Sequence, residues 1–251
     1  MSSSIWTRCA GDSELRPLNL SPWRVVEAQH QISTRKLVDS ADEQVLLEEM
    51  IDRVKPPDVT RGRLHYLLFT PFRYPPLAHG SRFGGRHERG IWYGSLERRS
   101  AFAEVAYYRL LFLEGTRASL GTVTTGLTAF TARVRTTRGI DLVSPPFDAY
   151  RRVIASPTSY ASTQPLGTAM RSAGVEAFRF PSARDADGGI NVGVFVATVF
   201  GNTKPRSLET WHCSASRERV EITKGDYFKR DSFAFPRAQF LVKGVLPAPA
   251  L

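Results

Sequence analysis

The sequence lacks the segments that carry proteins into or across membranes. No run of apolar residues approaches the roughly 18 that a membrane-spanning helix needs. Asp12 and Glu14 interrupt the N-terminal stretch, which therefore does not show the basic and then apolar order of a signal peptide. We accordingly expect a protein of the cytoplasm that works without a membrane.

Cysteine is scarce, with Cys9 and Cys213 the two in a chain of 251 residues. They lie far apart in sequence, so neither a disulfide framework nor a four-cysteine zinc cluster is expected. The 5 histidines show no metal-ligand spacing; they are His30, His65, His79, His87 and His212. We predict two free thiols and no metal site.

Several nucleotide-binding and hydrolytic motifs are also missing. No G-x-G-x-x-G follows a predicted strand, and no P-loop G-x-x-x-x-G-K-[ST] occurs. The G-x-S-x-G nucleophile elbow and the H-E-x-x-H zinc motif are missing too. These absences argue against a Rossmann dehydrogenase, a P-loop kinase, a serine hydrolase of the elbow type and a zinc protease.

Lysine is scarce and arginine is abundant. Of the 34 basic residues 6 are lysine, which leaves 34 − 6 = 28 arginines, and the formal net charge is +10. A planar guanidinium binds phosphate or carboxylate oxygens through two hydrogen bonds, so this chain suits polyphosphate ligands, nucleic acid or an acidic protein partner. The alternative is that the arginines reflect a compositional bias and form a solvated basic surface. Only the clustering of arginine in the middle of the chain favours a functional role over this alternative.

Hydrophobic patterning separates an N-terminal part from one large domain. Residues 1–22 show no sustained period and are expected to form an arm. Ser40 and Glu43 have capping-box spacing, and a stripe of helical period follows until the sequence Lys-Pro-Pro at 55–57. We predict an N-terminal arm and helical extension over residues 1–57 and a catalytic domain over residues 58–251. The extension helix is expected to pack on that domain or on a second subunit in a homodimer, or to bind a partner.

Apolar strands mix irregularly with few helices in the remainder. Strands are predicted at 64–69, 91–94, 128–134, 177–180, 190–200 and 239–246. One helix is predicted from Ser100, as its N-cap, to Gly115, and another over 164–173, ending at Gly174. This order favours an α+β domain over a regularly alternating doubly wound sheet.

Residues suited to catalysis concentrate between Arg73 and Glu104. Residues 72–104, which contain this block, read FRYPPLAHGSRFGGRHERGIWYGSLERRSAFAE and combine glycine turns, several arginines, an aromatic pair and a carboxylate near a helix start. Glu104 is predicted in the first helical turn, where the positive end of the helix favours an ionised carboxylate. The alternative makes Glu104 a plain helix-start acid and Arg82 a salt-bridged loop residue.

This block resembles the RES-domain family, which is named for its Arg, Glu and Ser positions. GSRF at 80–83 is similar to the family's Arg motif, IWYGS at 91–95 to its Tyr strand, and SAFAE at 100–104 to its Glu helix. Arg82, Tyr93 and Glu104 follow one another at intervals of eleven residues. FPSAR at 180–184 is similar to the Ser element. The resemblance spans about residues 63–200, and the segment before it indicates the longer RES subgroup.

The resemblance implies a compact fold related to the ADP-ribosyltransferases, with NAD as the substrate and no other cofactor. The positions that it carries over are, for catalysis, Arg82, Tyr93 and Glu104, and, for substrate binding, Ser182 with Arg73 or Arg63. Relatives split NAD by hydrolysis or by phosphorolysis, which uses inorganic phosphate as co-substrate. They are toxins neutralised by an Xre-type helix-turn-helix antitoxin, so nucleic acid is reached only through the antitoxin.

The chemistry of NAD agrees with these residue types. Nicotinamide leaves as a neutral molecule, so the barrier lies in the positive charge that builds on the ribose, and a fixed carboxylate such as Glu104 stabilises that charge. Arg82 and Arg73 are expected to bind the pyrophosphate or an attacking phosphate. Tyr93 is expected to stack on a ring and to orient Glu104 through its hydroxyl. Ser182 is expected to hydrogen-bond the nicotinamide amide or a ribose, or else to cap a turn.

Two other functions stay open at this level. An ADP-ribosyltransferase that modifies a protein needs the same residues, because only the acceptor differs among water, phosphate and protein. A non-enzymatic basic module would use the arginines to bind nucleic acid, although no helix-turn-helix or aromatic-basic strand motif is visible.

Overall fold

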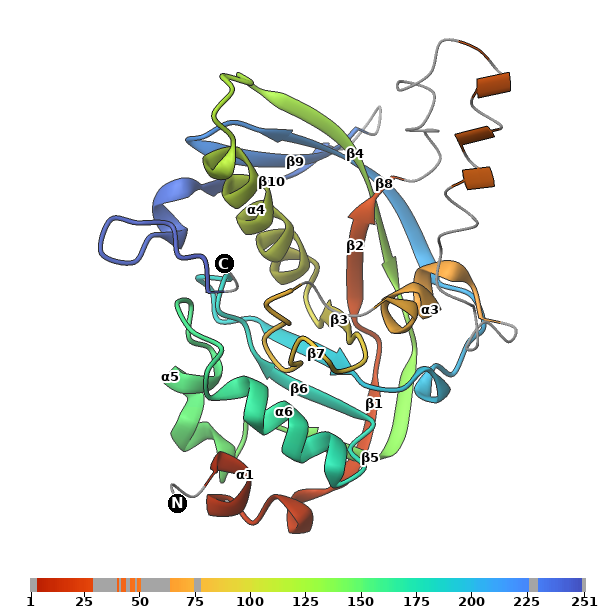
Figure 1. Ribbon diagram of the computed structural model, residues 1–251, viewed down its shortest axis with the longest axis vertical. Coiled ribbons are helices and arrows are strands. Elements are labelled where there is room, and N and C mark those ends of the chain that lie inside the picture. The colour runs from red at the N-terminus through yellow and green to blue at the C-terminus, as the bar shows by residue number, and fades with distance from the viewer. Residues whose placement is uncertain are drawn as a thin grey trace.

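One sheet of ten strands organises the part of the chain described by the computed structural model (Figure 1). The structure describes residues 4–28, 40, 42–43, 46–47, 49–50, 64–74, 78–225 and 230–249. In order across the sheet the strands are β1 (Arg16–Leu20), β5 (Val134–Asp141), β6 (Ala177–Pro181), β7 (Ile190–Val194), β3 (Trp92–Ser95), β2 (Trp23–Glu27), β4 (Val123–Thr131), β8 (Arg206–Ala215), β9 (Arg219–Gly225) and β10 (Arg230–Pro236). The β5–β6 pair is parallel and the other pairs are antiparallel. A mainly antiparallel sheet with helices packed on it confirms the predicted α+β class.

Several short helices and one long helix, α4, accompany this sheet (Figure 1). The α-helices are α1 (Ile5–Arg8), α3 (Tyr66–Arg73), α4 (Arg98–Gly115), α5 (Arg151–Ile154) and α6 (Thr163–Ser172). Single 3-10 turns are η1 (Gly11–Glu14), η3 (Phe147–Tyr150), η4 (Ala197–Val199) and η5 (Arg237–Phe240). None of the helices in the described ranges is long and apolar enough to cross a membrane.

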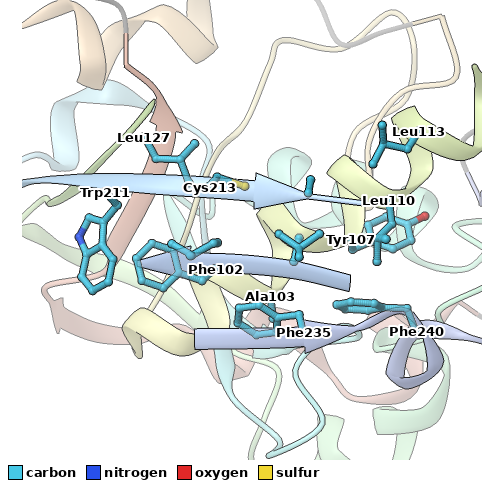
Figure 2. Packing of buried hydrophobic residues seen from close by; sticks show 14 of the residues in the cluster. Phe102, Ala103, Tyr107, Leu110, Leu113, Leu127, Trp211, Cys213, Phe235 and Phe240 are labelled. Carbon is cyan, nitrogen blue, oxygen red and sulfur yellow. The ribbon is translucent and has the colours of Figure 1, made fainter. Parts of the chain in front are cut away.

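The largest hydrophobic core lies between α4 and the strands β8, β9 and β10 (Figure 2). Phe102 of α4 packs edge-on against Trp211, with 4.7 Å between the ring centroids, and both side chains are fully buried. Burial of one such side chain contributes about 1.5–3 kcal/mol. The hydroxyl of Tyr107 donates a 2.6 Å hydrogen bond to the carbonyl of Pro247, which ties the C-terminal segment to the same helix. This core fixes α4 over the sheet.

A second core joins α6 and α1 to the strands β5 and β6. Phe83 is buried there and meets Phe178 and Phe180 edge-on, each with 4.8 Å between ring centroids. Gly167 of α6 lies so close that a Cβ atom added to it would stand 1.8 Å from the carbonyl oxygen of Phe83. The loop that carries Arg82 is therefore clamped between α6 and the sheet.

The start of α4 differs from the prediction. The helix begins at Arg98 with Glu97 as N-cap, whereas Ser100 was predicted to be the N-cap. Ser100 is fully buried, and its hydroxyl donates a 2.5 Å hydrogen bond to Asp185, so a tertiary contact takes the place of the cap. Glu104 consequently lies in the second turn, and its prediction as a first-turn acid is wrong. The predicted C-terminal end at Gly115 is confirmed.

Residues 64–69 form no strand, contrary to the prediction. Tyr66–Arg73 is the helix α3, and the His65 side chain caps it by accepting the N–H of Leu67 at 3.3 Å. The run at 64–69 is mostly apolar, and periodicity cannot separate a strand from a helix over so few residues.

Other boundaries were predicted too long. The strand predicted at 128–134 is two strands, because β4 ends at Thr131 and β5 begins at Val134. The strand predicted at 190–200 ends at Val194 and gives way to η4. Residues 239–246 form no strand but the turn η5 followed by an isolated bridge. The strands β8, β9 and β10 were not predicted. Those predicted at 91–94 and 177–180, and the helix ending at Gly174, are confirmed.

The predicted N-terminal arm is largely folded. Residues 4–27 form α1, η1, β1 and β2, and the last two belong to the central sheet, so the prediction of an arm is wrong there. Ser40 accepts the N–H of Glu43 at 3.2 Å, as the capping box requires. Leu46 and Met50 are more than half exposed, so the predicted stripe is not packed at these positions. Val45, residues 51–57 and the proposed domain boundary lie outside the described residues, and the division into two parts stays a prediction.

The contact between Gly167 and Phe83 gives a test of the fold. Gly167→Ala forces the Phe83 backbone to move, and overpacking of this kind typically costs about 1–3 kcal/mol. We expect the free energy of unfolding in urea to fall by that amount. Gly115→Ala is the control, because nothing lies within 4 Å of the added Cβ and alanine is the better helix former. Equal stability of the Gly167→Ala variant and the unmodified protein would show that α6 does not clamp the loop.

Candidate active site

The sheet is split between β2 and β3. These strands share a single registered pair, Trp23 with Ser95, whereas β2 forms five pairs with β4 and β3 forms four with β7. Beyond this pair β2 and β3 are no longer in register with each other. Backbone N–H and C=O groups of β3 on that side therefore have no partner strand. At Gly94 the approach is so close that a Cβ atom would lie 2.7 Å from the carbonyl oxygen of Trp23.

A cavity of about 670 Å³ lies at this split. Its wall is formed by β2, β3, one side of α4, the loop at 81–82 and single residues of other segments, namely Leu127, Tyr160, Phe180 and Asn191. Its volume is within the range of about 300–1,000 Å³ of small-molecule sites. Arg82, Tyr93 and Glu104, which the sequence singled out, all line this one cavity.

Glu104 is held in place through one of its carboxylate oxygens. Oε1 accepts a 2.7 Å hydrogen bond from Nδ2 of Asn191 and a 3.1 Å hydrogen bond from the hydroxyl of Ser182. Asn191 is itself fixed, because the buried hydroxyl of Ser95 donates to its Oδ1 at 2.7 Å. Among the described residues nothing donates to the second oxygen of Glu104. One oxygen therefore orients the group, and the other is free for a ligand.

Arg82 carries a positive charge without an acidic partner in the described part of the chain. Its Nη1 donates to the carbonyls of Ile154 at 3.1 Å and Ser156 at 2.8 Å, and its guanidinium lies 4.8 Å from the ring centroid of Tyr160. The residue is 9% exposed. Neutral carbonyls and a ring orient this cation without neutralising it, so an anionic ligand in the cavity would be attracted to it.

Tyr93 supports the loop and does not touch Glu104. Its hydroxyl shares a 3.0 Å hydrogen bond with Ser81 and accepts the N–H of Phe83 at 3.2 Å. Burial raises the pKa of Tyr93 to about 12, so the phenol stays neutral. The prediction that this hydroxyl orients Glu104 is wrong, because the carboxylate is oriented by Asn191 and Ser182 instead.

Ser182 lies behind the cavity and is not among the residues that line it. Its oxygen accepts the backbone N–H groups of Arg184 and Asp185, each at 3.1 Å, and its proton goes to Glu104. All the hydrogen-bonding capacity of this hydroxyl is used inside the protein. Ser182 therefore caps a turn, as the alternative prediction had it, and it also helps to position Glu104. A direct contact of Ser182 with nicotinamide or ribose is not supported.

Arg73, one of the two upstream arginines considered for substrate binding, does not line the cavity. Arg73 is the last residue of α3, and its guanidinium lies 5.7 Å from the ring centroid of Tyr74. Arg63 lies outside the described residues. The cavity wall does contain an arginine that sequence reasoning missed, Arg24 of β2, and the amide of Asn191 was missed as well. A lone polar residue in the apolar strand 190–194 was the available signal for Asn191.

Neither a metal centre nor a reactive thiol accompanies the site in the described part of the chain. No group of three or more His, Cys, Asp or Glu residues there could hold a metal ion. Cys9 and Cys213 are free, buried and in different cores. Burial raises the pKa of each thiol, which disfavours the nucleophilic thiolate.

Comparison with known proteins identifies the family. No curated protein matches the chain. A similar solved structure is the crystal structure of the M. tuberculosis MbcT-MbcA toxin-antitoxin complex, with 12% sequence identity, a TM-score of 0.48 and coverage of 86% of this chain and 94% of the other. The family model for the RES domain matches residues 55–216, which includes the Arg, Tyr, Glu and Ser positions singled out from the sequence. The chain belongs to the RES-domain family.

Proposed function

We propose that the protein degrades NAD by cleaving the bond between nicotinamide and ribose. The observation that carries this proposal is the arrangement of Glu104: one oxygen is fixed by Asn191 and Ser182, and the residue lines a cavity that also contains the unneutralised cation of Arg82. A preorganised carboxylate next to an anion-binding arginine suits a substrate that bears phosphates and reacts through a cationic ribose.

In the proposed reaction the C1′–N bond breaks and nicotinamide leaves with the electron pair. Because NAD carries the nicotinamide as a pyridinium, the leaving group is neutral and needs no proton. Positive charge grows on the ribose, and the ionised Glu104 stabilises it through the oxygen that the protein leaves free. The acceptor then attacks C1′, and its proton is released to solvent or to a nearby base.

Hydrolysis and phosphorolysis share this first step. With water as acceptor the products are nicotinamide and ADP-ribose, and with inorganic phosphate the ribose receives a phosphate at C1′. Arg82 binds the pyrophosphate of the substrate or the attacking phosphate in either case. Tyr93 supports the 81–83 loop that presents Arg82.

The family resemblance further supports a role as the toxin of a toxin–antitoxin pair. We propose that a cognate antitoxin, of the Xre helix-turn-helix type, neutralises the protein in the cytoplasm, and that any contact with nucleic acid is made through this partner. A carboxylate on such a partner would pair with Arg82, which has no acidic partner among the described residues. The homodimer predicted from the sequence stays a prediction.

The reaction itself is the first test. Purified protein is incubated with NAD, with and without inorganic phosphate, and the products are identified by mass spectrometry. We expect nicotinamide to be released, with ADP-ribose formed if water is the acceptor and a phosphorylated ADP-ribose if phosphate is. Transfer of ADP-ribose to a protein would favour the transferase alternative, and intact NAD in every arm would contradict the proposal.

Substitution Glu104→Gln tests the catalytic carboxylate. The amide oxygen of glutamine can still accept from Asn191 and Ser182, so the fold is expected to survive while the negative charge is lost. Loss of one preorganised electrostatic contact costs about 2.7–4 kcal/mol, so kcat should fall roughly a hundred- to a thousand-fold. The readout is nicotinamide release, with circular dichroism as the folding control. A folded variant that cleaves NAD at nearly the unmodified rate would make Glu104 a structural residue.

Substitution Asn191→Leu tests the positioning of that carboxylate. Leucine has a similar size but removes the 2.7 Å donor to Glu104. A hydrogen bond to a charged group contributes about 1.5–3 kcal/mol, so we expect kcat to fall roughly ten- to a hundred-fold with a smaller change in KM. Ser95→Ala is the matched comparison: it loosens Asn191 but keeps the donor to Glu104, so we expect a smaller loss of kcat than in Asn191→Leu. A rise in KM as large as the fall in kcat, or no change in either constant, would contradict a positioning role.

A further inference from the structure

The cavity has a polar end and an apolar end, which lie at different turns of α4. Glu104 marks the polar end, where it is bound by the amide of Asn191. Tyr108 and Phe112 line the same cavity farther along the helix and share one helix face with Glu104, because these residues follow one another at intervals of four. Glu104 and Phe112 are 112 − 104 = 8 residues apart, which places them about 12 Å from each other along the helix axis.

Two large aromatic side chains are exposed at the apolar end. Tyr108 is 56% exposed and Phe112 is 57% exposed, whereas Phe102 and Tyr107 of the same helix are buried in the core. Exposed aromatic surface is unfavourable in water, and a ligand that covers it gains the free energy of its burial. Because both rings belong to the cavity wall, a molecule bound in the cavity can cover them.

The charged groups at the apolar end neutralise each other. Arg109, which precedes Phe112 by one turn of α4, forms an ion pair with Glu27 of β2. Leu127, the strand partner of Glu27 on β4, also lines the cavity. Arg82, by contrast, has no acidic partner in the described part of the chain. The apolar end therefore suits a flat, neutral ring better than a phosphate, and the ion pair can hydrogen-bond the polar edge of such a ring.

The proposed substrate carries two rings, and their positions in the molecule distinguish them. Nicotinamide is bonded to the ribose carbon at which Glu104 stabilises charge in the proposed reaction, so it has to lie beside this carboxylate. Adenine is joined to that ribose through the pyrophosphate and a second ribose, and it lies farther away. Phe112, about two helical turns from Glu104, is therefore placed for adenine and not for nicotinamide.

We propose that Tyr108 and Phe112 form the binding surface for the adenine base of the dinucleotide. The identity of the ligand rests on the proposed function. A purine stacks on an aromatic ring through its flat face, and loss of one such ring weakens binding about five- to a hundredfold. Since α4 carries both this surface and Glu104, the helix itself fixes the distance between the base and the reacting ribose.

The experiment measures binding without turnover. The probes are AMP and ADP-ribose, and the readout is the affinity by titration calorimetry. The test variant is Phe112→Ala, which removes an exposed ring and is expected to fold, with circular dichroism as the check. Phe112→Trp retains a ring for stacking. The matched control is Tyr66→Ala, which removes an exposed aromatic side chain from α3, outside the cavity.

We expect Phe112→Ala to bind ADP-ribose about five- to a hundredfold more weakly than the unmodified protein, and AMP likewise. Phe112→Trp and Tyr66→Ala should retain the affinity for both probes. Equal affinity of Phe112→Ala and the unmodified protein overturns the proposal. It is also overturned if neither probe binds the unmodified protein, or if Tyr66→Ala loses as much affinity as Phe112→Ala.

Kinetics with NAD separate this inference from the proposed function. If the protein cleaves NAD, Phe112→Ala should raise KM and leave kcat nearly unchanged, because the ring holds the substrate far from the reacting bond. If ADP-ribose binds through Phe112 but NAD stays intact, the base-binding surface is supported and the proposed reaction is wrong. If Phe112→Ala cleaves NAD with an unchanged KM, the reaction stands and the role of Phe112 is refuted.

Discussion

The single backbone pairing between Trp23 and Ser95 is the constraint on which the site depends. A continued ladder would close the sheet between β2 and β3, where the cavity lies. Because the ladder stops, Arg24 bonds the carbonyl of Tyr93 in place of a strand neighbour, and a cavity of about 670 Å³ remains beside it. Two contacts hold the walls of this cavity in place. The core between α4 and the strands β8, β9 and β10 fixes α4, and the contact of α6 with Phe83 fixes the 81–83 loop.

Charge balance distinguishes Arg24 and Arg82 of the cavity from the arginines that pair with acids. Arg98, Arg99 and Arg179 each have a carboxylate partner, so their charges are neutralised inside the protein. Arg24 and Arg82 face neutral carbonyls and aromatic rings instead. The large excess of arginine in the sequence says little by itself, since several arginines form ion pairs outside the cavity. Both line the cavity that contains Glu104, and in the proposed function Arg82 binds the phosphates of the substrate.

The sequence predicted the centre of the site well, since three motifs at intervals of eleven residues placed Arg82, Tyr93 and Glu104 on a loop, a strand and a helix that meet at one cavity. It predicted the supporting contacts poorly. Asn191 and Arg24 are brought to the cavity by strand pairing, which a single chain does not reveal, and the five-residue strand β2 is too short to show a clear period.

The same limit explains the wrong predictions of secondary structure. The run at 64–69 is too short and too apolar to show a helical period, and Ser100, a residue type that favours a cap, donates its hydroxyl to Asp185 instead. At Ser100 a contact between distant segments thus overrode a local pattern. Helix ends and strands that depended on local turn chemistry, such as Gly174 after α6, were predicted correctly.

The central claim is that Glu104 stabilises positive charge on the ribose as nicotinamide leaves. The most direct measurement is the rate of a single turnover of NAD carrying deuterium at the ribose C1′, compared with unlabelled NAD. A carbon that gains cationic character in the transition state reacts more slowly when it bears deuterium, so the account predicts a normal secondary isotope effect on nicotinamide release. Equal rates for the two substrates, or no release of nicotinamide, would contradict the account.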